Sequence, residues 1–166
     1  MVRLFVIEAE IEKAFKKTVE DYKNGRIGTE EDFRACLYRH MKQFCDSKWL
    51  LMRLIPDAGI KNETMQPDIS IFRDGRKTVA IETMKNENSS LVGGNTDIER
   101  LRGYRKDYRR GYFIHIDQKD NRYKKQRRYA EWKNNYFIDL WYVIDTDTSH
   151  KCEFKRGIKK SKCSTI

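Results

Sequence analysis

The stretch QPDISIFRDGRKTVAIETMKNEN, residues 66–88, contains two apolar, β-branched runs around the turn residues Asp74 and Gly75. Runs of this kind with a short polar turn between them are typical of a β-hairpin. Asp68 stands at the start of the first run, and Glu82 stands near the end of the second. The stretch therefore predicts a hairpin that carries one carboxylate on each strand.

The pairing register of this hairpin decides whether the two carboxylates meet. A two-residue turn would leave them on different faces of the ribbon. A longer loop centred on Gly75 instead sets Ile69 opposite Ile81, which matches apolar with apolar side chains. We expect this second register, in which Asp68 lies directly opposite Glu82.

Two carboxylates at directly opposed positions repel each other, so a positive charge is expected between them. A hard divalent cation with oxygen ligands meets this need, and Mg²⁺, or Mn²⁺ in its place, is the predicted cofactor. Such an ion polarises a phosphoryl oxygen and generates a hydroxide nucleophile near neutral pH. Asp68 and Glu82 are therefore predicted to form a metal site.

Two helices are expected before the hairpin. Apolar residues recur at helical spacing from Leu4 to Tyr22, and Gly25 can end this first helix. Thr29 is a suitable N-cap for the second helix, whose apolar residues continue to Phe44. The run WLLMRLIP that follows fits either a strand or an extension of the second helix.

Beyond the hairpin, a capping-box pattern at Thr96 predicts a helix, and the run GYFIHID predicts a strand. A basic helix over residues 119–134 and a last strand, YFIDLWYVID, follow. This mixing of helices and strands indicates an α/β protein with a mixed sheet. We expect a single domain over residues 1–149 and a flexible basic tail over residues 150–166.

Residues 29–117 resemble the PD-(D/E)xK nuclease superfamily. The resemblance rests on a helix that carries an acid, PD on a strand, a tight turn, an IE strand followed by a lysine, and a helix opening with DIERL. It implies a restriction-endonuclease-like core of order α-β-β-β-α-β, a mixed β-sheet flanked by helices, here with an extra N-terminal helix. It also implies a metal-dependent nuclease that hydrolyses DNA phosphodiester bonds, frequently as a homodimer.

The resemblance implies that Asp68 and Glu82 bind Mg²⁺ and that a lysine two residues after the second acid orients the attacking water. Met84 occupies that lysine position, and Lys85 comes one residue later. In a regular strand Lys85 would point away from the acids, whereas a bulge at Met84 would bring it back. This departure leaves open an alternative, a non-catalytic nucleic-acid-binding or regulatory protein on a degenerate nuclease scaffold.

Members of the family often use a further acid from the first core helix, and Glu30 is the candidate here. An acid in a first helical turn also complements the helix dipole, so a purely structural role is the alternative. Glu63, in the loop before the hairpin, is a competing third ligand. The predicted catalytic residues are Asp68, Glu82, Lys85 and Glu30.

Lysine and arginine total 35 against 25 acidic residues, which gives a formal net charge of +10. The excess is concentrated over residues 100–133. Such a surface gains affinity for DNA because it releases condensed counterions. The predicted phosphate-binding residues are Arg100, Arg102, Arg105, Lys106, Arg109, Arg110, Lys124, Lys125, Arg127 and Arg128.

The tyrosines interleaved with these basic residues fit either stacking on unpaired bases or packing in the core. A third function, RNA binding, would require aromatic side chains on the surface of a sheet. Tyr112, Phe137 and Trp141 are the residues that this alternative depends on.

Cys36, Cys45, Cys152 and Cys163 show no CxxC spacing, so neither a zinc ribbon nor a redox motif is indicated. We expect reduced thiols in an intracellular protein; the alternative is a chain from a hyperthermophile, in which intracellular disulfides occur. The N-terminal sequence meets acids too early for a signal peptide, and no apolar run approaches the roughly 18 residues of a spanning helix. No membrane partner is therefore expected.

His40 and His115 are predicted to be structural histidines with satisfied hydrogen bonds. His150 together with Cys152 and Cys163 is only a weak signal for a soft metal, because a fourth ligand is missing.

Overall fold

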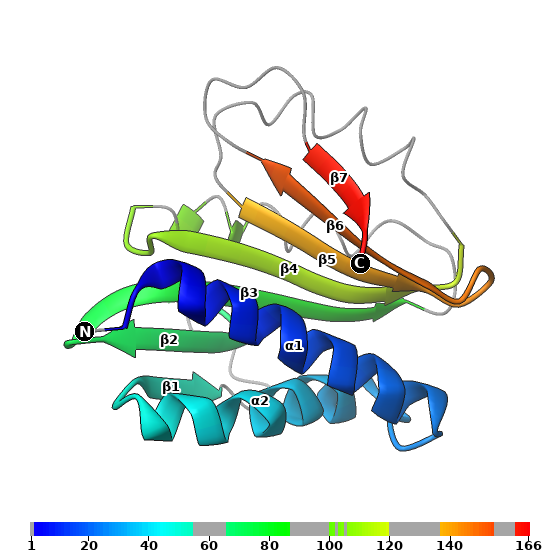
Figure 1. Ribbon diagram of the computed structural model, residues 1–166, viewed down its shortest axis with the longest axis horizontal. Helices are drawn as coiled ribbons and strands as arrows, with labels where there is room; N and C mark the ends of the chain where they lie inside the picture. The colour runs from blue at the N-terminus through cyan, green and yellow to red at the C-terminus, as the bar shows by residue number, and fades with distance from the viewer. Residues whose placement is uncertain are drawn as a thin grey trace.

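The structure is a computed structural model that describes residues 2–54, 66–86, 100–101, 103–104, 106–119, 137–154 and 162–166. The described residues form two helices and one seven-stranded sheet, so the protein is of the α/β class (Figure 1). The elements are α1 (Leu4–Lys23), α2 (Glu30–Ser47), β1 (Leu51–Leu54), β2 (Ile69–Arg73), β3 (Arg76–Asn86), β4 (Arg110–Asp117), β5 (Phe137–Val143), β6 (Thr148–Phe154) and β7 (Lys162–Thr165). The capping box at Thr96 and the predicted basic helix from residue 120 onward lie outside the described residues.

The strands lie side by side in chain order from β1 to β7. Strands β1, β2 and β3 are antiparallel neighbours, and β3, β4 and β5 are parallel. Strands β6 and β7 extend the sheet in antiparallel order. The sheet is therefore mixed, as predicted.

The main core lies between the two helices and one face of the sheet. Helix α1 contributes Ile7, Ile11 and Phe15, and α2 contributes Phe33 and Leu37, all fully buried. Because these residues recur at helical spacing, each helix turns an apolar stripe toward the sheet. The sheet contributes alternate residues of its central strands, since side chains alternate between its two faces.

The predicted helix boundaries are confirmed. Thr29 is the N-cap of α2: its hydroxyl accepts a hydrogen bond from the Asp32 N–H at 3.1 Å, and Asp32 Oδ2 accepts one from the Thr29 N–H at 2.9 Å. This reciprocal pair is a capping box. Gly25 follows α1 with a φ of 70°, in the left-handed region that commonly terminates helices.

The run WLLMRLIP forms a strand rather than an extension of α2. Trp49 has a φ of 57°, which lies outside the helical region, so α2 does not continue through it. Strand β1 then pairs with β2, with Leu51 opposite Phe72 and Leu54 opposite Ile69.

The predicted hairpin register is confirmed, since Ile69 lies opposite Ile81 and Ile71 lies opposite Val79. This register places these four apolar residues on the helix-facing side of the sheet, where they are fully buried.

The turn differs from the longer loop that we expected. Asp74 and Gly75 have positive φ values, 51° and 72°, and β2 and β3 pair directly on either side of them. The pairing shifts between Ile71 and Phe72, which leaves Thr78 as an extra residue on β3. This bulge moves the register by one residue, so a two-residue turn and the expected register coexist.

The segment 150–166, predicted to be a flexible tail, contributes strands to the sheet, and that prediction is wrong for β6 and β7. Strand β6 pairs with β5, and β7 pairs with β6, with Cys152 opposite Cys163. His150, Cys152 and Phe154 are buried at alternate positions of β6. The charged residues between them masked this alternation in the sequence.

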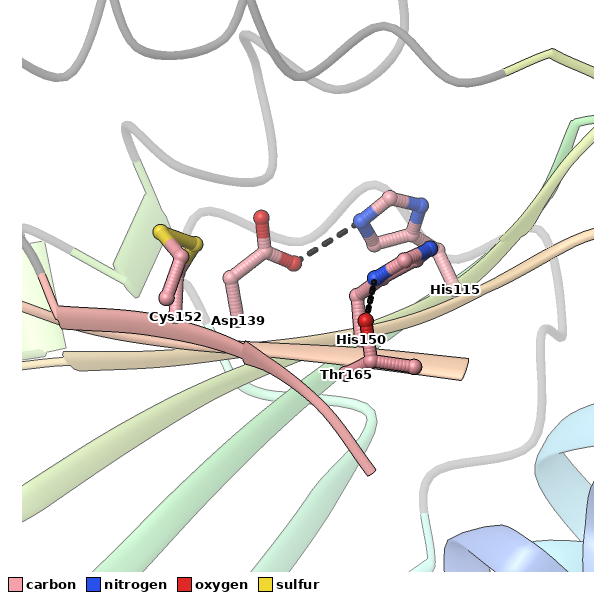
Figure 2. The surroundings of a disulfide bond; sticks show 6 residues. His115, Asp139, His150, Cys152 and Thr165 are labelled. Atoms are coloured by element: carbon pink, nitrogen blue, oxygen red, sulfur yellow. Dashed lines mark hydrogen bonds and ion pairs between the residues drawn. A yellow bond between two sulfur atoms is a disulfide. The ribbon is translucent and has the colours of Figure 1, made fainter. Parts of the chain in front are cut away.

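Cys152 and Cys163 form a disulfide between β6 and β7, beside Asp139 (Figure 2). The prediction of reduced thiols is therefore wrong for this pair, whereas Cys36 and Cys45 are free thiols. Spacing alone does not reveal such a partnership, because the strand register brings the two cysteines together.

Reduction of this disulfide is expected to lower the free energy of unfolding by about 3 kcal/mol, because the bond restricts the unfolded chain. Urea unfolding with and without dithiothreitol measures the change. Cys163→Ser is the control, since its stability should not respond to the reductant. Alkylation and mass spectrometry that find four thiols in the unreduced protein would contradict the disulfide.

Asp21, near the end of α1, connects the two helices. Its carboxylate accepts hydrogen bonds from Cys36 at 3.0 Å and Arg39 at 2.9 Å, contacts His40 Nε2 at 2.7 Å, and pairs with Arg26 at 2.8 Å. These partners, the Cys36 thiol first and His40 next, hold the pKa of Asp21 well below its ordinary value of 3.8. Burial, together with the Asp21 carboxylate, raises the pKa of Cys36 to about 11. His40 has the hydrogen-bond partner that we predicted.

The lowered pKa of Asp21 predicts a specific loss of stability in acid. A carboxyl group whose pKa is depressed on folding stabilises the protein above its unfolded-state pKa, at about pH 4, and this contribution is lost as the pH falls further. Urea unfolding in a buffer containing EDTA, at about pH 6 and about pH 3, measures the loss. Asp21→Asn should lose less stability over this interval than the wild type. An equal loss in both proteins would contradict the prediction.

Tyr112, Phe137 and Trp141 are buried, so these three residues do not provide the surface aromatics that the RNA-binding alternative requires. Within the part of the chain that the structure describes, no helix is long and apolar enough to span a membrane.

Candidate functional site

Asp68 lies one residue before β2, at the point where the pairing with β3 ends. Its Oδ2 accepts hydrogen bonds from the backbone N–H and the hydroxyl of Thr83, both at 2.8 Å. The carboxylate thus satisfies a backbone N–H of β3 just beyond the end of the β2 pairing. Only 15% of the Asp68 side chain is exposed, so its charge lies in a partly dehydrated environment.

Arg34 of α2 reaches the same point from the helix side. Its Nη2 lies 3.4 Å from Asp68 Oδ1 and 3.4 Å from Glu30 Oε1. Its Nε donates to the Thr83 hydroxyl at 3.3 Å, and the side chain is 8% exposed. One buried guanidinium therefore holds two carboxylates that come from different elements.

Glu30 opens α2 and lies one helical turn before Arg34, at the spacing that favours an ion pair. Its Oε2 accepts a hydrogen bond from the Lys85 N–H at 3.4 Å. Burial raises the pKa of Glu30 above its ordinary value of 4.5; the Lys85 N–H and Arg34 oppose the rise, and the charges of Asp68 and Glu31 add to it. The structure thus brings two of the predicted catalytic acids to one place.

Lys85 faces the helices. The pairing of β3 with β4 runs without interruption, and Met84 lies opposite His115. The bulge at Met84 that would turn Lys85 toward Glu82 is therefore absent, and the two side chains lie on opposite faces of β3. The Lys85 ammonium donates to the Gly28 carbonyl at 2.6 Å.

Glu82 lies on the face of β3 that is turned away from the helices. Its side chain is 1% exposed, and its Oε2 lies 3.8 Å from Nη1 of Arg100. Burial, followed by the nearby Glu82 carboxylate, raises the pKa of the Tyr104 hydroxyl. The charge of Asp68 adds a smaller rise to the pKa of Tyr104, so both carboxylates act on this hydroxyl. The hydrogen bonds and the ion pair of Asp68 are instead with Thr83 and Arg34.

Sequence analysis missed Arg34 and Thr83. For Arg34 a signal exists, since it follows Glu30 at the i,i+4 spacing. Thr83 stands two residues before Lys85, which is the spacing of the acid and the lysine in the PD-(D/E)xK pattern. On the face that carries the Asp68 contacts, the residue two before the lysine is thus a threonine rather than an acid.

The predicted phosphate-binding residues are described only in part. Lys106 and Arg109 are exposed, as a DNA contact requires. Arg110 instead pairs with Glu8 of α1 and is 13% exposed, which argues against a role in phosphate binding. Arg100, as described above, lies beside Glu82. The remaining predicted phosphate-binding residues lie outside the described part of the chain: Arg102, Arg105, Lys124, Lys125, Arg127 and Arg128. Glu63, the competing third metal ligand, also lies outside it.

The tyrosines among these basic residues belong to the core wherever the structure describes them. Tyr104 and Tyr108 are buried and pack with Ala80, Leu101 and Phe113 on the face of the sheet away from the helices. Base stacking by these two tyrosines is therefore not supported.

His115 is fully buried with a carboxylate at each ring nitrogen. Its Nδ1 lies 3.1 Å from Asp117 Oδ1, and its Nε2 lies 2.8 Å from Asp139 Oδ1 (Figure 2). His150 Nε2 lies 2.8 Å from the Thr148 hydroxyl. Both histidines thus have the partners expected of structural histidines.

Potential metal ligands also gather elsewhere. Within the described ranges, one group of three or more His, Cys, Asp or Glu side chains has ligand atoms within 4.8 Å of one another, and it consists of Asp21, Cys36 and His40. Glu30 and Asp68 are not members of such a group. They would therefore offer an ion two protein ligands rather than three.

No family model, curated protein or solved structure matches this chain.

Proposed function

We propose that the protein is a metal-dependent nuclease that hydrolyses DNA phosphodiester bonds at a site formed by Glu30, Asp68 and Lys85. The observation that carries the proposal is the convergence of two carboxylates, each 3.4 Å from Nη2 of Arg34, on the face of the sheet to which Lys85 turns. Carboxylates that can hold a cation, beside a lysine that can orient water, are groups that metal-assisted hydrolysis uses.

The order of the elements supports the proposal. Helix α2, strands β1 to β3, helical residues near Leu101 and strand β4 follow one another as α-β-β-β-α-β. This is the order expected for a restriction-endonuclease-like core, which we also propose. The net charge of +10 suits a DNA partner, and a homodimer would bring two sites to the two strands.

Mg²⁺ or Mn²⁺ is the proposed cofactor. Hard divalent ions prefer carboxylate oxygens, and Mg²⁺ is usually held by one or two carboxylates together with water. The donor set of Glu30 and Asp68 fits this chemistry, provided that Arg34 withdraws from between them. When bound, the ion supplies a Lewis acid for a phosphoryl oxygen and lowers the pKa of bound water.

The remaining side chains have separate tasks. Lys85 would leave the Gly28 carbonyl and hold the attacking water, since its long stem allows this rotation. Arg34, once displaced, would pair with a phosphate oxygen and stabilise the negative charge that develops there. Glu82, expected as a ligand from the sequence, would instead hold Arg100 in place.

DNA binding without cleavage is the second candidate function, and two observations favour it. Arg34 already supplies the positive charge that two neighbouring carboxylates need. Thr83, rather than an acid, stands two residues before Lys85 on that face. A protein with this site would retain DNA through its basic residues and leave it intact.

Incubation with supercoiled plasmid and linear duplex DNA separates the two functions. Cleavage that requires Mg²⁺ or Mn²⁺ and stops with EDTA is expected for the nuclease. Mobility shifts of the same DNA, measured in EDTA, report binding alone. A salt-sensitive shift without cleavage under any metal condition would select the second function.

A further inference from the structure

A second group of side chains that can bind a metal lies between α1 and α2. It does not include Asp68 or Glu30. Cys36 and His40 lie one turn apart on α2, and Asp21 approaches them from the end of α1. The Cys36 Sγ lies 3.0 Å and the His40 Nε2 lies 2.7 Å from the same atom, Asp21 Oδ2. A thiol, an imidazole and a carboxylate thus converge on one point.

We propose that Asp21, Cys36 and His40 bind a zinc ion that ties α1 to α2, with water as the fourth ligand. Zinc accepts sulfur, nitrogen and oxygen ligands together in tetrahedral sites. Magnesium and manganese favour oxygen ligands instead. The donor set therefore separates this site from the one at Glu30 and Asp68.

The spacing of the three ligand atoms is close to what one ion requires. All three lie within 4.8 Å of one another. Zinc lies about 2.0–2.3 Å from each ligand atom, so the ligands of a tetrahedral site are roughly 3–4 Å apart. Small rotations that move Asp21 away from Cys36 and His40 would open space for the ion. Binding releases the thiol proton of Cys36 to solvent, and the thiolate then donates its electron pair to zinc.

Two arginines share the carboxylate and must give way. Arg26 and Arg39 pair with Asp21 at 2.8 Å and 2.9 Å, but both side chains are 67% exposed. Because both guanidinium groups are largely in contact with water, each can leave the carboxylate and turn into solvent. Asp21 itself is 7% exposed and belongs to the last turn of α1, so its carboxylate stays near Cys36 and His40 when the arginines leave.

The group lies on two packed helices and is accessible to an ion. All three ligands belong to the two long helices, which pack on each other in the main core. The His40 side chain is 19% exposed, so an ion can enter without unfolding the core. Because zinc would bind the folded chain and cross-link two helices, it should raise the melting temperature.

The test uses the full-length protein, stripped of metal with EDTA and kept with its Cys152–Cys163 disulfide closed. Calorimetry measures zinc uptake, and Co²⁺ serves as a spectroscopic probe, since a bound thiolate gives a ligand-to-metal charge-transfer band. The wild type should bind one zinc per chain and show the band. Cys36→Ser should lose the band, and Cys36→Ser and His40→Gln should each weaken zinc binding more than about a hundredfold.

Cys45→Ser is the matched control, because Cys45 is the other free thiol of α2. It should retain both the zinc affinity and the Co²⁺ band. Asp68→Asn should also retain them, so a failure of the proposed nuclease site leaves this result unaffected. The absence of zinc uptake by the wild type, or equal uptake by Cys36→Ser, would overturn the proposal.

Discussion

Asp68→Asn is expected to lower the rate of metal-dependent DNA cleavage by at least about a hundredfold. The change removes the negative charge with little change in volume, so an ion loses one of its two protein ligands. Loss of a single group that stabilises developing charge typically costs a factor of about 10²–10³ in rate. Single-turnover cleavage of plasmid DNA at saturating Mg²⁺ measures the effect.

Glu30→Gln should act in the same direction, and Glu31→Gln is its matched control. Glu30 and Glu31 are adjacent in the first turn of α2, so both complement the helix dipole, but only Glu30 contacts Arg34. Glu31→Gln should therefore cleave like the wild type. Equal losses in the two variants would indicate a helix-capping effect and contradict a metal-binding role for Glu30.

Arg34→Met is expected to reduce the free energy of unfolding by about 3 kcal/mol in the absence of divalent ions. The change removes the charge that faces Asp68, which is 15% exposed, and an uncompensated buried charge is costly. The pair with Glu30, a side chain that is 37% exposed, is screened by solvent and adds little. Urea unfolding in EDTA measures the loss.

Mg²⁺ should restore part of that stability, because the ion would take the place of the guanidinium between the two carboxylates. Arg39→Met is the matched control: Arg39 lies on the same helix, its side chain is 67% exposed, and Asp21 keeps Arg26, Cys36 and His40 as partners without it. This control should lose less than about 1 kcal/mol and gain nothing from Mg²⁺. If Arg34→Met were as stable as the wild type, Arg34 would not be the residue that compensates the buried charge of Asp68.

Local patterns predicted much of the fold. The N-cap of α2 at Thr29, the end of α1 at Gly25 and the pairing of Ile69 with Ile81 depend on neighbouring residues and on the alternation of side chains. The sequence could not predict how the two-residue turn is reconciled with this register. The bulge at Thr78 shifts the register by one residue and so makes the two compatible. No particular residue type marks such a bulge in a sequence.

Long-range contacts account for what was missed. Strand β7 pairs with β6, which itself pairs with β5. The four residues of β7, KCST, are too few to show a strand pattern in the sequence. The disulfide of Cys152 follows from the same pairing. In the candidate site, Glu30 and Asp68 were both identified, but the guanidinium that joins them comes from a residue that no family pattern marks.

For Lys85, the family motif and the geometry of the strand give different partners. The motif associates this lysine with Glu82, three residues earlier. In a regular strand, residues three apart lie on opposite faces. Lys85 instead shares its face with Thr83, which contacts both Asp68 and Arg34. In the site that we propose on this face, a helix acid, Glu30, would take the place of the strand acid of the pattern.

Calorimetric titration with Mg²⁺ tests most directly whether Glu30 and Asp68 share a cation. The Cys36→Ser background excludes uptake at the proposed zinc site. In that background, we predict one Mg²⁺ per chain, lost in both Glu30→Gln and Asp68→Asn and retained in Glu31→Gln. No Mg²⁺ uptake, or uptake that neither Glu30→Gln nor Asp68→Asn reduces, would contradict the account.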